Sequence, residues 1–192
     1  MARDRATDTS KLLAAAAETF REKGYHNTTI DDIAEAAGIS RPTVYKYTKS
    51  KQWLLDRMVA ELEQDLGDRF EKLMRAEHDP LTRLRLAIKA NIAAATENRT
   101  FYAIAFSEQT ELSNHARERF TTWAHDVTLT FKDLLDECLF AGSVPDGTDT
   151  WLAANLILSM FTSLHRWYDA DGPVSPEQLG DQVILMLGDR SV

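Results

Sequence analysis

The 192-residue chain is poor in cysteine, glycine and proline, and it lacks a long apolar run. Its single cysteine, Cys138, excludes an intrachain disulfide framework and a multi-cysteine metal site. Apolar residues are densest in residues 151–164, but Asn155, Ser159 and further hydroxyl residues interrupt this stretch, which is too short and too polar to span a bilayer. No apolar segment precedes a cleavage site at the N-terminus. These absences predict a cytoplasmic protein without a membrane segment.

Signatures of catalysis are also scarce. No glycine-rich phosphate loop occurs, and the histidines lack the spacing of metal ligands: His26, His78, His115, His125 and His165. Cys138 stands among apolar residues of a helical pattern, which is typical of a core position rather than of a nucleophile. The sequence therefore predicts a protein that is not an enzyme and that has no metal site and no cofactor.

Alternation of apolar and polar residues at a period of two is absent, whereas apolar residues recur at steps of three and four along most of the chain. This pattern predicts an all-α fold of about nine helices. Beyond two short helices between 29 and 47, the expected helices cover about residues 9–23, 51 onwards, 80–95, 114–140, 149–168 and 176–187, with shorter pieces between 98 and 114.

Residues 28–51 carry the most informative pattern, because their spacing suits two short helices packed nearly at right angles. Gly38 stands in the turn, where a left-handed backbone is cheap only for glycine. Thr29 and Asp32 are placed to cap the first helix, and Ser40 to cap the second. The expected apolar seam between the two helices consists of Ile33, Ala37, Ile39, Val44 and Tyr47.

The second of these helices, about residues 40–47, is expected to present cationic, hydroxyl and flat aromatic groups outward. These are Arg41, Thr43, Tyr45 and Lys46, and such groups suit base edges and phosphates. The segment is therefore predicted to be a DNA-binding helix-turn-helix, with double-stranded DNA as the partner. The alternative is a helical hairpin buried in an ordinary α-protein.

The net charge of −8 conceals an uneven distribution. Residues 1–58 hold ten Lys and Arg against eight Asp and Glu, a balance of +2, and residues 59–192 hold twelve against twenty-two, a balance of −10. The small basic excess lies on the predicted DNA-binding part. The acidic remainder would be repelled by phosphate, which helps to orient the protein with one end on DNA.

The expected helix over residues 149–168 is apolar on nearly every side, so it must be buried all round. The prediction is a twofold homodimer in which the last two helices of each copy form a four-helix interface. A twofold protein also suits a palindromic DNA site. The alternative is a fully internal helix in a monomer.

The whole layout resembles the TetR family of transcriptional regulators. Over about the first 55 residues, the resemblance rests on Phe20, Gly24, Tyr25, Thr28, Thr29, Ile33, Ala34, Ala37, Gly38, Ile39, Ser40, Val44, Tyr45, Tyr47, Lys51 and Leu54. It implies a three-helix helix-turn-helix DNA-binding domain over residues 1–50 and a helical ligand-binding and dimerisation domain over residues 51–192. The family usually has an aromatic residue, most often Phe, where this chain has Thr48, which implies thinner packing between the recognition helix and the fourth helix.

The C-terminal phrase of residues 166–168 and 172–176 is similar to the end of several family members that regulate fatty-acid or steroid catabolism, some of which bind acyl-CoA thioesters. In the DNA-binding part, the resemblance implies phosphate contacts from Thr29, Ser40, Tyr47 and Lys51. It implies major-groove positions for Arg41, Thr43, Tyr45 and Lys46.

Family members usually carry a small-molecule pocket inside the C-terminal helices. Candidates with aromatic or polar character are Phe101, Tyr102, Phe106, Phe120, Trp123, Phe131, Trp151, Asn155, Met160 and His165. For each aromatic residue the alternative is plain core packing. For Asn155 and His165 it is a satisfied polar group or a dimer contact.

Together these observations predict a sequence-specific DNA-binding regulator. The resemblance to the TetR family implies repression, with release from a palindromic operator by a small, largely apolar effector such as an acyl-CoA or a lipid-like metabolite. The alternative is a helical ligand- or protein-binding adaptor whose helix-turn-helix does not read DNA.

Overall fold

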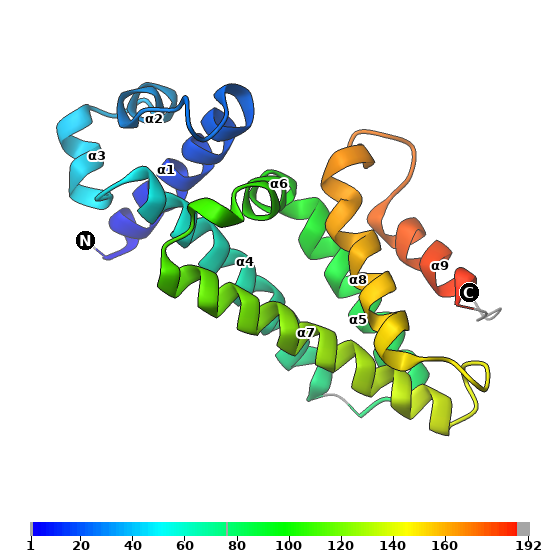
Figure 1. Cartoon of the computed structure of the whole chain (residues 1–192). Coiled ribbons are helices and arrows are strands. Elements are labelled where there is room, and N and C mark those ends of the chain that lie inside the picture. The colour runs from blue at the N-terminus through cyan, green and yellow to red at the C-terminus, as the bar shows by residue number, and fades with distance from the viewer. Residues whose placement is uncertain (1, 76, 188–192) are drawn as a thin grey trace. The chain divides into compact units, whose positions relative to one another are not determined.

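The computed structural model describes residues 2–75 and 77–187, with side chains from Thr9 onwards, and this part of the chain contains helices and no strand (Figure 1). The predicted all-α fold is confirmed. The helices are α1 (Ala2–Lys23), α2 (Ile30–Ala37), α3 (Arg41–Tyr47), α4 (Lys51–Met74), α5 (Pro80–Glu97), α6 (Arg99–Ser107), a 3-10 turn η1 (Gln109–Glu111), α7 (Asn114–Phe140), α8 (Thr150–Trp167) and α9 (Pro176–Met186). None of the described helices has the length and apolarity that a bilayer crossing would require.

Two compact units make up the fold. The first combines the chain up to Leu62 with Thr100–Phe120, and the second combines Glu63–Arg99 with the chain from Thr121 on. The helices α4 and α7 therefore each contribute to both units. The division of function at residue 50 remains a prediction.

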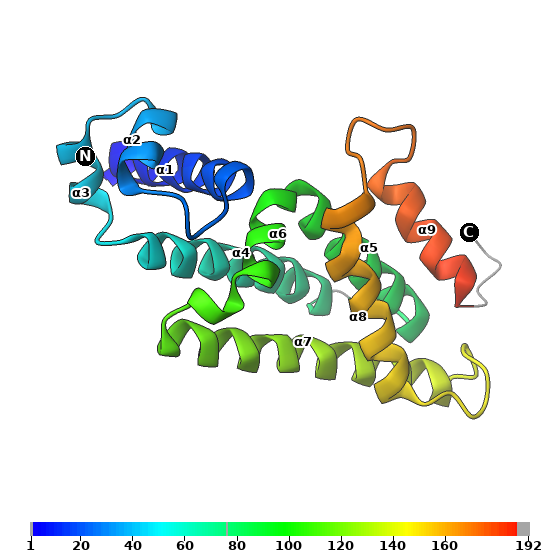
Figure 2. The ribbon, with the colours of Figure 1, turned by 45° about the horizontal axis from the view of Figure 1, so that its top comes forward.

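Local hydrogen bonds define the helix-turn-helix within the first unit. The Thr29 side chain accepts from the N–H of Asp32, and the Asp32 carboxylate accepts from the N–H of Thr29, so a full capping box begins α2. Gly38 ends α2 with φ of +67°, the left-handed conformation that its position in the turn predicted. Figure 2 shows α1, α2 and α3 grouped together.

The start of α3 differs from the expectation. Ser40 occupies the N-cap position, but its hydroxyl makes no hydrogen bond to the helix backbone. Instead, Ser40 Oγ lies 2.8 Å from Oγ1 of Thr43, one turn ahead. The prediction of a side-chain cap was therefore wrong, because the Ser40 hydroxyl pairs with the Thr43 hydroxyl and not with a backbone N–H.

The core of the first unit holds the two helices of the motif in place. The predicted face of α1 is buried and consists of Leu12, Leu13, Ala16, Ala17 and Phe20. Apolar residues of α2, α3 and α4 are buried as well: Ile33, Val44, Leu54, Leu55 and Met58. The ring of Phe20 packs on that of Tyr25 with 5.0 Å between their centroids. Burial of this apolar surface is the main stabilisation of the unit.

Thr48 lies where the resemblance implied an aromatic side chain. It is 2% exposed, and its hydroxyl donates to the carbonyl of Ser50 and accepts from the N–H of Ser50. Ser50 in turn accepts from the N–H of Trp53 and so caps α4, as a serine in that position favours. The link from α3 to α4 is therefore fixed by local hydrogen bonds at the position where a ring would supply packing.

The second unit is built around α5, which packs against α8 and α9. In both Figure 1 and Figure 2, α8 and α9 lie beside α5. Leu84, Ile88 and Ile92 of the predicted α5 stripe are buried. Within the single chain, however, α8 exposes one apolar face that includes Trp151, Leu152 and Leu156. A fully internal α8 in a monomer, the alternative to a dimer, is therefore not what the chain forms.

Candidate nucleic-acid interface

The helix α3 turns one face inward and another to solvent. Val44 is fully buried, whereas Arg41, Tyr45 and Lys46 are exposed, with 51% of Tyr45 accessible. Thr43 is half-buried. The side chains predicted to approach base edges thus lie on or beside the open face of one short, anchored helix.

Arg41 is held in place in the free protein by weak surface interactions. Its Nε lies 2.9 Å from Oδ1 of Asp31, and its guanidinium lies 5.8 Å from the centre of the Tyr45 ring. Both members of the ion pair are more than half exposed, so the pair contributes little to stability. A nucleic acid can therefore replace Asp31 as the partner of Arg41 at small cost.

Thr29, a predicted phosphate contact, uses its hydroxyl within the capping box. The hydroxyl donates to the Asp32 carboxylate at 2.7 Å, and Lys23 Nζ lies 2.7 Å from the same carboxylate group. The hydrogen bond from Lys23, followed by those from Thr29, holds the pKa of Asp32 well below its usual range. Thr29 therefore fixes the start of α2 whatever further contact it makes.

Lys51, at the start of α4, has a structural role that the sequence did not reveal. Its ammonium donates to the carbonyl oxygens of Tyr25 and His26 at 2.7 and 3.2 Å, and it lies 4.7 Å from the centre of the Tyr25 ring. Burial raises the pKa of the Tyr25 hydroxyl to about 12. An ammonium group has three donors, so one remains for a phosphate.

We expect Lys51→Ala to lower the melting temperature, because hydrogen bonds to a charged group contribute about 1.5–3 kcal/mol. If the third donor also holds a phosphate, the slope of log affinity for duplex DNA against log salt falls by about one unit. Lys49→Ala is the control for stability, since it removes an exposed ammonium two residues away. Thermal unfolding and binding at several salt concentrations measure the two effects. A wild-type melting temperature would show that the carbonyl contacts contribute nothing.

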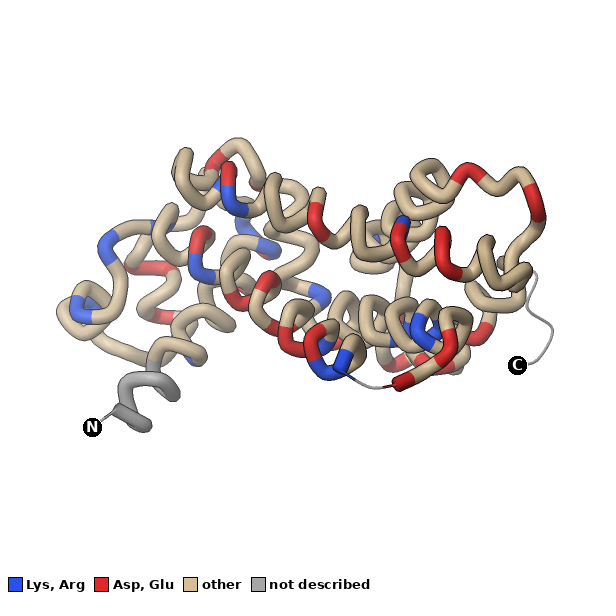
Figure 3. Tube along the Cα trace, turned by 90° about the horizontal axis from the view of Figure 1, so that it is seen from below, with Lys and Arg blue, Asp and Glu red and all other residues tan. Residues whose placement is uncertain are grey.

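Charge along the segment of residues 41–51 has one sign. From Arg41 to Lys51 the chain carries Arg41, Lys46, Lys49 and Lys51 and no carboxylate. Figure 3 marks the cationic positions in blue and the acidic positions in red, and both kinds occur in each unit. The local run of cations is the electrostatic feature that binding to a phosphate backbone requires, even though the whole chain is acidic.

The predicted ligand-binding residues fall into both units. In the first unit, Phe106 packs against Tyr102 and Phe120, with centroid distances of 5.9 and 5.6 Å. Tyr102 and Phe120 are buried, whereas Phe101 and Phe106 are half-buried. The structure therefore brings Tyr102, Phe106 and Phe120 into one aromatic cluster.

In the second unit, Phe131 is fully buried between Phe70 and Phe161, at centroid distances of 6.0 and 6.1 Å. The sequence prediction missed both of these ring partners. Trp123 is half-buried, and Met160 lines a cavity of about 250 Å³ together with side chains of α5, α8 and α9. This cluster and this cavity are two apolar features of the unit that could receive part of a ligand.

The remaining ligand-binding candidates, all on α8, are exposed or half-buried. Trp151 and Asn155 are exposed, and the Asn155 amide donates to the carbonyl of Trp151. Nδ1 of His165, which is half-buried, lies 2.7 Å from the carbonyl oxygen of Thr162. Contact of these three residues with a ligand remains a prediction.

Asn91 of α5 is a polar residue that the prediction overlooked. It is 4% exposed, and its Nδ2 has no hydrogen-bond partner among the described residues. The signal was present, because Asn91 follows Ile88 by three positions and precedes Ala95 by four, within the apolar stripe of the helix. A buried donor without a partner costs about 1–3 kcal/mol of folding free energy, so a polar residue at this position needs an explanation.

Cys138 behaves as the sequence indicated. It is fully buried, and burial raises the pKa of its thiol to about 11. The thiol therefore stays protonated near neutral pH, and a protonated thiol is a poor nucleophile.

Comparison with known proteins agrees with this architecture. Residues 12–58 match the family described as bacterial regulatory proteins, tetR family, and residues 77–189 match the tetracyclin repressor-like C-terminal domain. The HTH-type transcriptional repressor KstR2 of Mycolicibacterium smegmatis is 28% identical over 178 residues, which cover 92% of this chain and 87% of that protein. The fatty acid metabolism regulator protein of Bacillus subtilis is 22% identical over 92% of each chain.

Among solved structures, the ketosteroid transcriptional regulator KstR2 of Mycobacterium tuberculosis superposes with a TM-score of 0.86 at 25% identity, covering 93% of this chain and 92% of that one. The two family matches together span both the helix-turn-helix and most of the helices that follow it. The chain belongs to the TetR family of bacterial transcriptional regulators.

Proposed function

We propose that this regulator is a homodimeric repressor, which binds a palindromic operator and leaves it when a small, largely apolar effector binds. The observation that carries the proposal is the anchored helix α3, whose exposed Arg41, Tyr45 and Lys46 stand beside a surface run of cations. The family membership and the repressor name of the relative from M. smegmatis support it.

The proposed DNA contacts divide into two kinds. Thr29, Ser40, Tyr47 and Lys51 hold phosphates, and Arg41, Thr43, Tyr45 and Lys46 approach the major groove. Phosphate contacts fix the position of the protein, while base contacts give specificity. Thr43 is the informative case, because its hydroxyl already lies 2.8 Å from that of Ser40 and so has a defined position.

We expect Thr43→Ala to change the bases preferred in both half-sites of the palindrome, because each protomer of the dimer carries the substitution. One hydrogen bond contributes about 1 kcal/mol, so affinity for the wild-type sequence should fall by about fivefold per half-site and about thirtyfold for the dimer. Ser40→Ala is the matched comparison, because it removes the other hydroxyl of the same pair and should weaken binding to all sequences alike. Enrichment of duplexes from a random pool measures both. An unchanged base preference for Thr43→Ala would remove Thr43 from the specificity contacts.

The proposed dimer buries the exposed face of α8 and α9 against a second copy of the chain. Exposed apolar side chains gather on these two helices: Trp151, Leu152, Leu156, Trp167, Leu185 and Met186. Leu152, Leu156 and Ser159 follow at steps of four and three, the spacing of a helix-packing seam. Two copies related by a twofold axis would present their α3 helices to successive major grooves about 34–36 Å apart.

The proposed effector is lipid-like, in the class of a ketosteroid or an acyl-CoA. Two observations support an apolar ligand: the ring cluster around Phe131 and the cavity that Met160 lines. The amide of Asn91, which has no hydrogen-bond partner in the described part of the chain, supports a ligand that also carries a hydrogen-bond acceptor, such as a ketone or a thioester carbonyl. The relatives are named as regulators of ketosteroid and fatty acid metabolism, in keeping with this class.

Release from DNA follows from a population shift. An effector that binds better to an arrangement with the wrong separation of the α3 helices draws the dimer away from its operator. By linkage, operator DNA must weaken effector binding by the same factor. Equal effector affinity with and without operator would contradict this mechanism.

Selection of bound duplexes from a random pool at near-physiological salt tests the function directly. An enriched palindrome with half-sites about one helical turn apart is the expected result. Binding that occurs only at low salt, with no enriched sequence, would instead favour a helical adaptor whose helix-turn-helix does not read DNA.

A further inference from the structure

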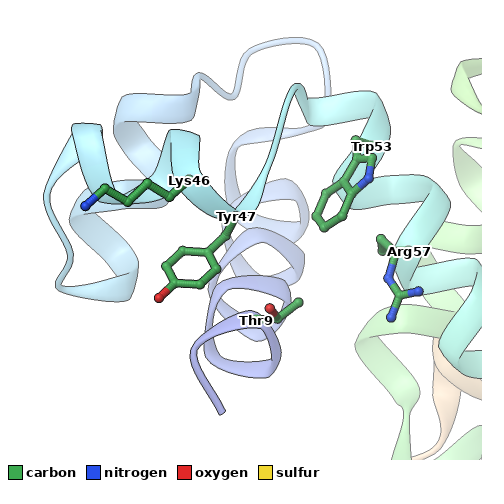
Figure 4. A pocket seen from close by; sticks show the side chains of 5 residues that line it. All are labelled: Thr9, Lys46, Tyr47, Trp53 and Arg57. Atoms are coloured by element: carbon green, nitrogen blue, oxygen red, sulfur yellow. The ribbon is translucent and has the colours of Figure 1, made fainter. Parts of the chain in front are cut away.

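A groove beside the recognition helix has a lining unlike that of the apolar cavities in the second unit. It lies wholly within the first unit and has a volume of about 550 Å³. Figure 4 shows its lining: Thr9 from α1, Lys46 and Tyr47 from α3, and Trp53 and Arg57 from α4. Three helices therefore form a hollow of the size that small-molecule sites in proteins commonly have.

The lining combines two cations with two aromatic rings. Among the described residues, no carboxylate lies within salt-bridge distance of the Lys46 ammonium. Arg57 has Glu61 as its acidic neighbour at 3.8 Å, a distance too long for a strong hydrogen bond. Among the side chains that the structure describes, from Thr9 onwards, the positive charge of the groove is thus only weakly compensated.

The Trp53 side chain determines which kind of anion the groove can bind. It is half-buried, and together with Tyr47 it gives the groove flat apolar surface next to the two cationic groups. A sugar–phosphate backbone offers an indole only the small C–H faces of deoxyribose, whereas a flat ring system can cover the whole indole face. A ring system that bears one phosphate or carboxylate would use both parts, by stacking on the aromatic side chains and by charge-assisted hydrogen bonds.

We propose that this groove binds a small anion with a flat apolar body, such as an aromatic phosphate or carboxylate. Lys46 and Arg57 hold the anionic group, and Tyr47 and Trp53 contact the ring. The site is separate from the effector pocket proposed for the second unit.

A consequence for regulation rests on the proposed function. Lys46 and Tyr47 are also the proposed DNA contacts at the end of α3, so an anion in the groove competes with operator DNA for the same two side chains. Such a ligand would displace DNA directly, without any change in the second unit.

Titration of the whole protein with 2-naphthyl phosphate tests the site. The chain has four tryptophans, and their indole N–H signals in a ¹H–¹⁵N spectrum can be assigned with single Trp→Phe variants. The signal of Trp53 is expected to shift, while those of Trp123, Trp151 and Trp167 stay in place. 2-Naphthoate should produce the same shift, and the neutral 2-naphthalenemethanol should bind at least about tenfold more weakly, because it lacks the charge.

Two charge-neutralising variants sharpen the test. Lys46→Gln and Arg57→Gln should each weaken binding of 2-naphthyl phosphate by about fivefold or more. Lys49→Gln is the matched control, since it removes an exposed cation that does not line the groove and should leave binding unchanged. The proposal would be overturned if the Trp53 signal does not shift, or if Lys46→Gln, Arg57→Gln and Lys49→Gln all bind 2-naphthyl phosphate equally.

Binding of duplex DNA by the Arg57→Gln variant is the remaining part of the test. Arg57→Gln should leave affinity for duplex DNA and its salt dependence unchanged. A salt slope that falls by about one unit would instead assign the groove to the DNA backbone and overturn the small-anion site. This outcome is distinct from failure of the regulator itself: with no selected operator, a Trp53 shift that depends on Lys46 and Arg57 would still establish the groove as an anion site.

Discussion

Leu156→Arg is expected to convert the protein to a monomer and to reduce operator affinity by at least about a hundredfold, because two linked half-site contacts become independent. Leu156 lies at the middle of the exposed stripe of α8 and is 59% accessible in the single chain. At a twofold interface the substitution acts twice, so it places two guanidinium groups in an apolar contact region without carboxylate partners. The first unit should keep its fold, since Leu156 belongs to the second unit.

Sedimentation or light scattering gives the mass of the variant, and a duplex-binding titration gives its affinity. Phe140→Arg is the matched control: Phe140 ends α7, is 96% exposed, and lies outside the proposed interface. It should remain dimeric and bind the operator as the wild type does. A dimeric Leu156→Arg protein with full operator affinity would exclude this face of α8 from the interface.

The helices themselves were predictable because their determinants are local. Apolar spacing of three and four, an Asp or Ser before a Pro, and Thr29 with Asp32 all act within one or two turns. The left-handed turn at Gly38 belongs to the same class, since it depends on one residue. These signals placed α2, α3, α5 and α9 nearly where the structure has them.

The partners of functional side chains could not be predicted in the same way. The resemblance implied a phosphate contact for Lys51, and the structure adds that its ammonium binds carbonyl groups 25 and 26 residues earlier in the chain. Ser40 was expected to cap a backbone N–H, but Thr43 competes for its hydroxyl. Such pairings depend on tertiary approach or on a choice between nearby donors, and periodicity carries no information on either.

The exposed face of α8 is a second feature that the sequence pattern could not predict. The sequence indicated a helix that is apolar all round, but it could not say which face is covered by the chain's own α5. In the structure Ala154, Ile157 and Phe161 are buried, whereas Leu152 and Leu156 are exposed. Periodicity thus predicts that a helix face will be buried, whereas the tertiary structure determines which element covers it.

Asn91→Leu is expected to make the free protein more stable and unresponsive to its effector. The substitution keeps the branched outline and the number of heavy atoms of the side chain, although leucine is larger. It removes a buried donor that has no partner among the described residues, so the free energy of unfolding should rise by about 1–3 kcal/mol. For a chain of this size, that is a rise in melting temperature of roughly 2–4 °C per kcal/mol. If the amide holds the acceptor group of the effector, operator binding persists while release is lost.

Release of a fluorescent operator duplex measures the response, with androst-4-ene-3,17-dione and octanoyl-coenzyme A as the first ketosteroid and thioester tested. Asn114→Leu is the control, because it removes an exposed amide at the start of α7 and should alter neither stability nor release. A lower melting temperature for Asn91→Leu would mean that the amide is hydrogen-bonded in solution. A variant that gains stability but still responds fully would show instead that the effector does not use this donor. Gain of stability with loss of release is the one combination that a purely structural Asn91 does not produce, since function and stability then change in opposite directions at a single buried amide.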